Sequence, residues 1–204
     1  MSTPKLPAAA LALAGALLLS GCGGLLPEPA EPPRTIDFGP AAERADAADS
    51  LRPIELARVD APRWLGGEAI HYRRVDTDPT TLRQYARHVW AAPPAELLRA
   101  EVERMLQANG ARDGSPEARL ELRLTRFEQV LTGAGEAHVE ARMRARLVRR
   151  DDGRVHQREL GVRIDATPDV DGAVTALPRA AHQLVDELGA WLASVHGREG
   201  EAGD

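Results

Sequence analysis

Residues 119–166 read RLELRLTRFEQVLTGAGEAHVEARMRARLVRRDDGRVHQRELGVRIDA, and apolar and polar residues alternate through most of them. Alternation with a period of two places successive side chains on opposite faces of a β-strand. The pattern predicts three long strands, Arg119–Leu131, Glu136–Arg150 and Arg154–Ala166. Because one face is apolar and the other charged, we expect an antiparallel meander with one side in water.

Turn residues between these strands set their register. Asp152-Gly153 suits a two-residue type I′ hairpin loop, and the glycines of a four-residue loop, Thr132–Gly135, mark the earlier reversal. These loops pair Leu124 with Met143, Leu122 with Ala145 and Leu120 with Leu147, and then Ala145 with Leu160, Met143 with Val162 and Ala141 with Ile164. Both hairpins then share one apolar face. The opposite face aligns Glu121, Arg146 and Glu159 as a ladder of alternating charge.

Two segments have the apolar spacing of amphipathic helices. The first starts at Pro93-Pro94 and ends at Asn109-Gly110, residue types that are common at helix starts and helix ends. Its apolar positions are Leu98, Val102, Met105 and Leu106. The second starts near Asp171, and its apolar stripe consists of Val174, Leu177, Ala181, Leu184, Leu188, Trp191 and Val195. Both helices are expected to cover the apolar face of the sheet.

Short strands are also predicted at Thr35–Phe38, Arg52–Val59 and Ala69–Val75, whereas the pattern of Leu82–Trp90 is ambiguous. Strands on one side and helices on the other predict an α+β fold: a two-layer domain in which an antiparallel sheet has two main helices packed on one face. We place this domain at residues 35–196, followed by a disordered polar tail at 197–204.

The N-terminus has the features of an export signal. Lys5 precedes an apolar run that is too short to cross a membrane, so we expect a signal peptide over residues 1–21. Leu19-Ser20-Gly21-Cys22 resembles a bacterial lipobox, in which the cysteine is lipidated; an ordinary signal peptide with a chance cysteine is the alternative. Residues 22–34 then form a Pro-rich tether. Gly23 stands where an aspartate would resemble an inner-membrane retention signal, which favours the outer membrane.

Composition excludes several classes of protein. The chain has 204 residues, a net charge of −5 and one cysteine, so an intrachain disulfide framework and a Cys-rich zinc site are excluded. The negative charge gives no reason to expect nucleic-acid binding. One predicted strand carries a cluster of arginines: Arg142, Arg144, Arg146, Arg149 and Arg150. We interpret the cluster as a solvated strand face, with contact to a partner or to lipid headgroups as the alternative and nucleic acid as a weaker third.

Catalytic motifs are absent from the sequence. There is no GxSxG nucleophile elbow and no HExxH metal motif, and the six histidines are scattered. Asp165, Asp169 and Asp171 faintly resemble a calcium loop, but the spacing is wrong, and Asp169 or Asp171 as a helix N-cap explains them better. We therefore predict a protein that is not an enzyme and has no metal and no cofactor.

Four of the seven aromatic residues lie close together in the sequence: Trp64, Tyr72, Tyr85 and Trp90. The surrounding pattern has Val59 and Pro62 at the end of a strand, then Trp64-Leu65, then Ile70 and Tyr72 in a strand, and later Trp90-Ala91-Pro93 opening a helix. This pattern resembles the ABC-type transport auxiliary lipoprotein family (PqiC-like proteins). It departs from the family in having Trp64 where tyrosine is usual and His71 inside the strand.

The resemblance implies a function. It implies a lipoprotein anchored in the outer membrane of a Gram-negative bacterium, facing the periplasm and carrying palmitate. There it would be a non-catalytic auxiliary subunit of an MCE/ABC-type intermembrane lipid transport system. The implied partners are an MCE-domain (MlaD/PqiB-like) protein and the membrane, with a homo-oligomer also compatible. The alternative function is a structural or assembly lipoprotein of the cell envelope that is not linked to transport.

The candidate site residues follow from the same reading. Cys22 is the candidate lipidation site. Trp64, Leu65, Tyr72 and Trp90 are candidates for binding a partner or a lipid chain, and packing in the core is the alternative for the aromatic residues among them.

Overall fold

The computed structural model describes residues 31–40, 51–111 and 114–200. Every helix and strand below belongs to one compact unit, which begins at residue 33. Cys22, the predicted signal peptide and most of the predicted tether lie outside the described residues, and so does the chain from residue 201 onward.

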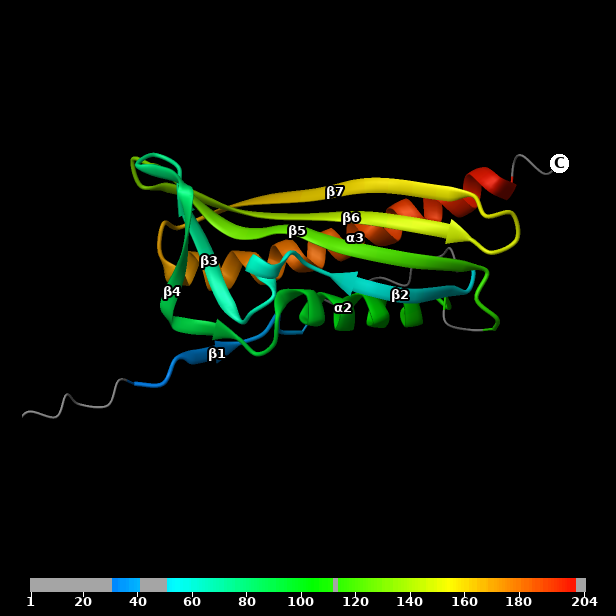
Figure 1. Cartoon of the computed structure of the whole chain (residues 1–204), viewed down its shortest axis with the longest axis horizontal. Coiled ribbons are helices and arrows are strands. Elements are labelled where there is room, and N and C mark those ends of the chain that lie inside the picture. Colours follow the sequence, from blue (N-terminus) through cyan, green and yellow to red (C-terminus); the bar gives the residue numbers. More distant parts are fainter. Residues whose placement is uncertain (1–30, 41–50, 112–113, 201–204) are drawn as a thin grey trace, which may run out of the picture. The chain divides into compact units, whose positions relative to one another are not determined.

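The described residues of this unit form seven strands, two α-helices and one short 3-10 helix (Figure 1). In chain order they are β1 (Arg34–Ile36), β2 (Ile54–Asp60), the 3-10 helix η1 (Arg63–Leu65), β3 (Ala69–Arg74), β4 (Asp78–Trp90), α2 (Pro94–Ala108), β5 (Ala118–Gly133), β6 (Glu136–Arg149), β7 (Val155–Ala166) and α3 (Val170–Gly200). The predicted α+β fold is confirmed, and the ambiguous segment before Trp90 is a strand. Helix α3 extends into the first residues of the predicted tail.

The sheet has the order β1-β4-β3-β5-β6-β7, with β2 also paired to β5. Strands β5, β6 and β7 form the expected antiparallel meander. Three further pairings are parallel, namely β1 with β4, β2 with β5 and β3 with β5, and the sequence pattern had not indicated them. Strands β2 and β3 share one edge of β5: β2 lies along Ala118–Arg123, and β3 lies along Gln129–Leu131.

The predicted register of the first hairpin is confirmed, because Leu120, Leu122 and Leu124 pair with Leu147, Ala145 and Met143. The predicted register of the second hairpin is wrong by two residues: Met143 pairs with Leu160 and Ala145 with Arg158. A shift of two residues leaves each side chain on the same face of the sheet. The predicted apolar face is therefore correct although the individual partners differ.

The loop of the second hairpin explains the shift. Arg149 N–H donates to the carbonyl of Arg154 at 2.9 Å, which closes a loop of four residues and not the predicted two. Within that loop the Asp152 carboxylate accepts a hydrogen bond from the Arg154 N–H at 2.8 Å, and Gly153 has a φ of 69°. The side chain of Asp152 thus forms an Asx turn that competes with the type I′ turn.

Both helices bury their apolar stripes against one face of the sheet (Figure 1). Helix α3 packs on β5, β6 and β7, while α2 packs on β2, β5 and α3. The predicted cap of α3 is confirmed: the Asp169 carboxylate accepts the Gly172 N–H at 2.8 Å, which satisfies a free donor at the helix start. Neither described helix is long and apolar enough to cross a membrane.

Candidate functional site

The face of the sheet opposite the helices carries rows of charged side chains. The β5–β6–β7 register gives the rows Glu121–Arg146–Gln157, Arg123–Arg144–Glu159 and Glu128–Glu140–Arg163. The predicted contact between Glu121 and Arg146 is confirmed at 3.1 Å. The predicted third member of that ladder is wrong, because the shifted register brings Glu159 to Arg144, at 3.6 Å.

An irregularity in β5 carries one carboxylate into a buried position on this face. The register with β6 shifts between Leu124 and Arg126, so Phe127 points into the core and Glu128 to the charged face. The Glu128 side chain is only 1% exposed, and Arg73 and Arg126 both contact its carboxylate. Since an unpaired buried charge is costly, Glu128 depends on these two arginines.

Glu140 lies across from Glu128 on β6 and belongs to the same network. Burial opposes its ionisation, but hydrogen bonds from Arg126 at 2.6 Å and His138 at 3.2 Å outweigh burial and hold the pKa of Glu140 below its ordinary value. The bond to Glu140 in turn raises the pKa of Arg126. This end of the charged face is therefore internally neutralised.

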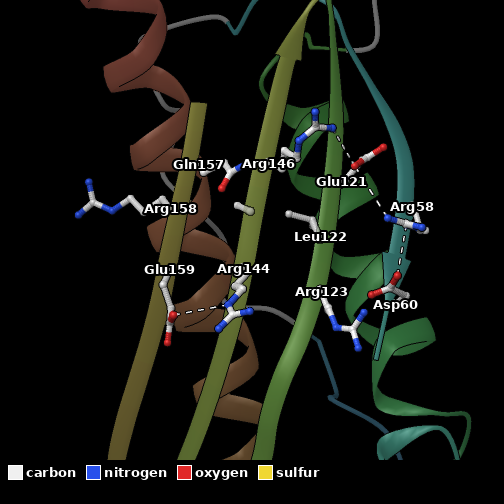
Figure 2. A pocket seen from close by; sticks show the side chains of 11 residues that line it. Arg58, Asp60, Glu121, Leu122, Arg123, Arg144, Arg146, Gln157, Arg158 and Glu159 are labelled. Atoms are coloured by element: carbon white, nitrogen blue, oxygen red, sulfur yellow. Dashed lines mark hydrogen bonds and ion pairs between the residues drawn. The ribbon is translucent and has the colours of Figure 1, made fainter. Parts of the chain in front are cut away.

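Further along the same face lies a groove of about 400 Å³ (Figure 2). Strands β2, β5, β6 and β7 contribute its lining. The charged lining residues are Arg58, Arg123, Arg144, Arg146, Arg158, Asp60, Glu121 and Glu159. The Arg158 side chain points away from the groove (Figure 2), which leaves four arginines against three carboxylates and a local excess of positive charge, in contrast with the net charge of −5 of the whole chain.

The four candidate binding residues, Trp64, Leu65, Tyr72 and Trp90, differ in how far they are exposed. Trp90 and Leu65 are buried in the core, where Trp90 packs edge-on against Phe38, with ring centroids 5.4 Å apart. Tyr72 is half-buried and stacks on Tyr85 at 4.5 Å. Trp64, on η1, is 44% exposed.

Residues 35–189 match the model of the family described as the ABC-type transport auxiliary lipoprotein component. The chain belongs to this family. Protein XCC0632 from Xanthomonas campestris has a similar fold: the TM-score is 0.64 at 21% identity, covering 86% of this chain and 94% of that one. An uncharacterized protein of known structure has a TM-score of 0.55 at 16% identity over 79% of this chain and 99% of its own. No curated protein shows significant sequence similarity to the chain.

Sequence reasoning missed one polar side chain that organises the core of this auxiliary lipoprotein. Tyr85 Oη donates to Gln129 Oε1 at 2.5 Å, and Gln129 Nε2 donates to the carbonyls of Thr167 and Asp169 at 2.7 and 3.2 Å. The buried Gln129 thus ties β4 and β5 to the start of α3. Tyr85, which makes the hydrogen bond to Gln129, also stacks on Tyr72. Burial raises the pKa of Tyr85, so its hydroxyl stays protonated as a donor.

The described part of the auxiliary lipoprotein has no group of three or more His, Cys, Asp or Glu side chains placed to hold a metal ion. Its polar clusters consist of arginine–carboxylate pairs on a sheet face. Such pairs suit the binding of a charged or polar partner.

Proposed function

We propose that the chain is an outer-membrane-anchored periplasmic lipoprotein and a non-catalytic auxiliary subunit of an MCE/ABC-type intermembrane lipid transport system. The observation that carries the proposal is the family match over residues 35–189, whose description joins a lipoprotein to ABC-type transport. The lipobox-like Leu19-Ser20-Gly21-Cys22 provides an independent argument for the anchor. Its partner in this proposal is the MCE-domain protein of the transporter.

Lipidation of Cys22 would hold the protein at a bilayer, because acyl chains partition at about 0.8 kcal/mol per buried methylene and two or more chains give stable anchoring. The Pro-rich stretch GGLLPEPAEPPR then gives the domain reach. Twelve residues at about 3.1 Å each span up to roughly 37 Å if they are fully extended as polyproline II. A lipid anchor, a stiff spacer and a folded domain suit a subunit that docks a transporter component at a distance from the membrane.

Two substitutions test the anchor and its destination separately. Cys22→Ala should abolish incorporation of labelled palmitate and release the protein into the periplasmic fraction. Gly23→Asp should leave lipidation intact but move the protein from the outer to the inner membrane. Palmitate labelling that persists in Cys22→Ala would contradict the lipidation site, and inner-membrane location of the unaltered protein would contradict the sorting.

The transport role is tested in a strain that lacks the gene. Radiolabelled phospholipid exchange between the two membranes should slow, and expression of the intact chain should restore it. A structural or assembly lipoprotein would instead weaken the envelope while leaving the exchange rate unchanged. An unchanged exchange rate would therefore favour the alternative function, a structural or assembly lipoprotein.

A further inference from the structure

Two arginines stand side by side on the charged face, with one carboxylate in ion-pair contact between them. Arg123 on β5 and Arg144 on β6 are direct partners in the antiparallel register. Like charges in directly opposite positions destabilise a sheet. Among the residues that the structure describes, Arg123 has no carboxylate within the 4.0 Å of an ion pair, and Arg144 has only Glu159, at 3.6 Å and half-exposed.

Two other arginines of this face are paired with carboxylates at short distances. Arg146 contacts Glu121 at 3.1 Å, and Arg126 contacts Glu140 at 2.6 Å. Asp60 lies beside Arg123 in the β2–β5 register, yet its Oδ2 contacts the Nε of Arg58 at 3.2 Å. Its other oxygen, Oδ1, is buried and accepts no hydrogen bond from any described residue.

The row across the groove therefore reads Asp60, Arg123, Arg144, Glu159: two positive groups flanked by two negative ones (Figure 2). We propose that this groove binds the zwitterionic headgroup of a phospholipid such as phosphatidylethanolamine. Its phosphate would lie between the guanidinium groups of Arg123 and Arg144, and its ammonium group would face Asp60 or Glu159. Guanidinium forks match the geometry of phosphate oxygens, and the β5–β6 register places these two arginines directly opposite each other.

The flanking carboxylates favour this ligand over a polyacidic protein segment. An extended acidic peptide would bring further negative charge against Asp60 and Glu159, which costs binding energy. A zwitterionic headgroup has complementary charges for this row, since its phosphate faces the arginines and its ammonium group faces a carboxylate. The volume of about 400 Å³ also fits a headgroup rather than an extended chain. The choice of a phospholipid as the source rests on the proposed transport function, whereas the phosphate site rests on the groove alone.

The test titrates the full lipoprotein, purified in an uncharged detergent without phosphate, with glycerophosphoethanolamine and follows the arginine Nε–H signals by NMR. Inorganic phosphate and glycerol are the comparison probes. We expect saturable binding of glycerophosphoethanolamine, weaker binding of phosphate and none of glycerol. Arg123→Gln and Arg144→Gln should each weaken binding at least fivefold. Arg87→Gln, which removes the same charge from an exposed position on β4, should leave it unchanged.

Three results would overturn the proposal: no saturable binding, equal loss of affinity in Arg87→Gln, or phosphate binding as tight as that of glycerophosphoethanolamine. The last result would indicate a site for a simple anion. Failure here is distinguishable from failure of the transport role, because the titration needs no partner protein. A chain without the headgroup site would still co-purify with an MCE-domain protein if the transport proposal is correct.

Discussion

Arg73 on β3 holds the buried carboxylate of Glu128 on β5 with both arms of its guanidinium group: Nε lies 3.3 Å from Oε1, and Nη2 lies 3.2 Å from Oε2. Nη1 of the same group donates to the Pro79 carbonyl on β4 at 3.0 Å. The parallel contact of β3 with β5 extends only over Tyr72–Arg74. Strands β3 and β4 are an antiparallel pair, and this one side chain fastens the pair to β5 of the meander, where only three residues of β3 are in register.

Replacing Arg73 with methionine should destabilise the protein by about 3 kcal/mol, because it leaves the buried Glu128 without its main partner. Urea unfolding of the intact chain measures the loss. The double variant Arg73→Met with Glu128→Leu should recover most of it, since removing both charges avoids an unpaired one. A double variant no more stable than Arg73→Met would show that the pair acts through packing rather than through charge.

Gly172 is required by a close approach at the start of α3. A Cβ at this position would lie 2.2 Å from the Thr167 carbonyl oxygen, which is rigid backbone. Gly172→Ala should therefore displace the Asp169 cap and cost about 2–4 kcal/mol in unfolding free energy, combining overpacking with loss of the cap. Gly67→Ala is the matched control, because a Cβ there meets nothing within 4 Å. Equal stability of the two variants would refute this account of the helix start.

The pH dependence of stability should depend on Glu140. Its pKa in the folded protein lies below the ordinary value of 4.5, so the ionised carboxylate stabilises the fold above that pH and the contribution is lost as pH falls through the folded-state pKa. Glu140→Gln should lower stability near neutral pH and show a smaller decline on acidification than the unaltered protein. Thermal unfolding across a pH series measures both effects. Parallel curves for the two proteins would exclude this role of Glu140.

Trp64 is the candidate residue that remains accessible for a partner. We expect Trp64→Ala to lower the yield of the co-purified MCE-domain protein at least tenfold, because tryptophan is one of the residues that most often dominate binding energy at interfaces. Val155→Ala is the matched control, since Val155 is 43% exposed but lies at the start of β7. Both variants should melt at the same temperature as the unaltered chain. Intact co-purification of Trp64→Ala would move the partner surface elsewhere.

Sequence reasoning succeeded where a local pattern sets the outcome. The alternation in residues 119–166 identified the buried face of β5–β7, and the apolar spacing identified both helices. It failed for the second hairpin register, because the Asp152 side chain selects a longer loop. It also missed the parallel neighbours of β5, since their pairing joins segments that are far apart in the chain.

For the candidate site, too, local patterns were informative, but contacts between distant segments could not be predicted. Trp64 and Trp90 cannot be told apart by residue type, and only the fold places one on the surface and the other in the core. The arginine cluster was visible in the sequence, but only the fold shows that Arg142 contacts Glu140 whereas Arg144 and Arg146 line the groove. The groove itself requires the alignment of Asp60 on β2 with Arg123 on β5, which no local pattern encodes.

Affinity purification of the full-length lipoprotein from detergent-solubilised envelopes, followed by mass spectrometry, tests the central claim most directly. The transport account predicts that an MCE-domain protein and its ABC permease co-purify with the unaltered chain. Their yield should fall sharply in Cys22→Ala, which cannot reach the membrane. Recovery of the lipoprotein from intact envelopes without any MCE-domain or ABC component would contradict the proposed function.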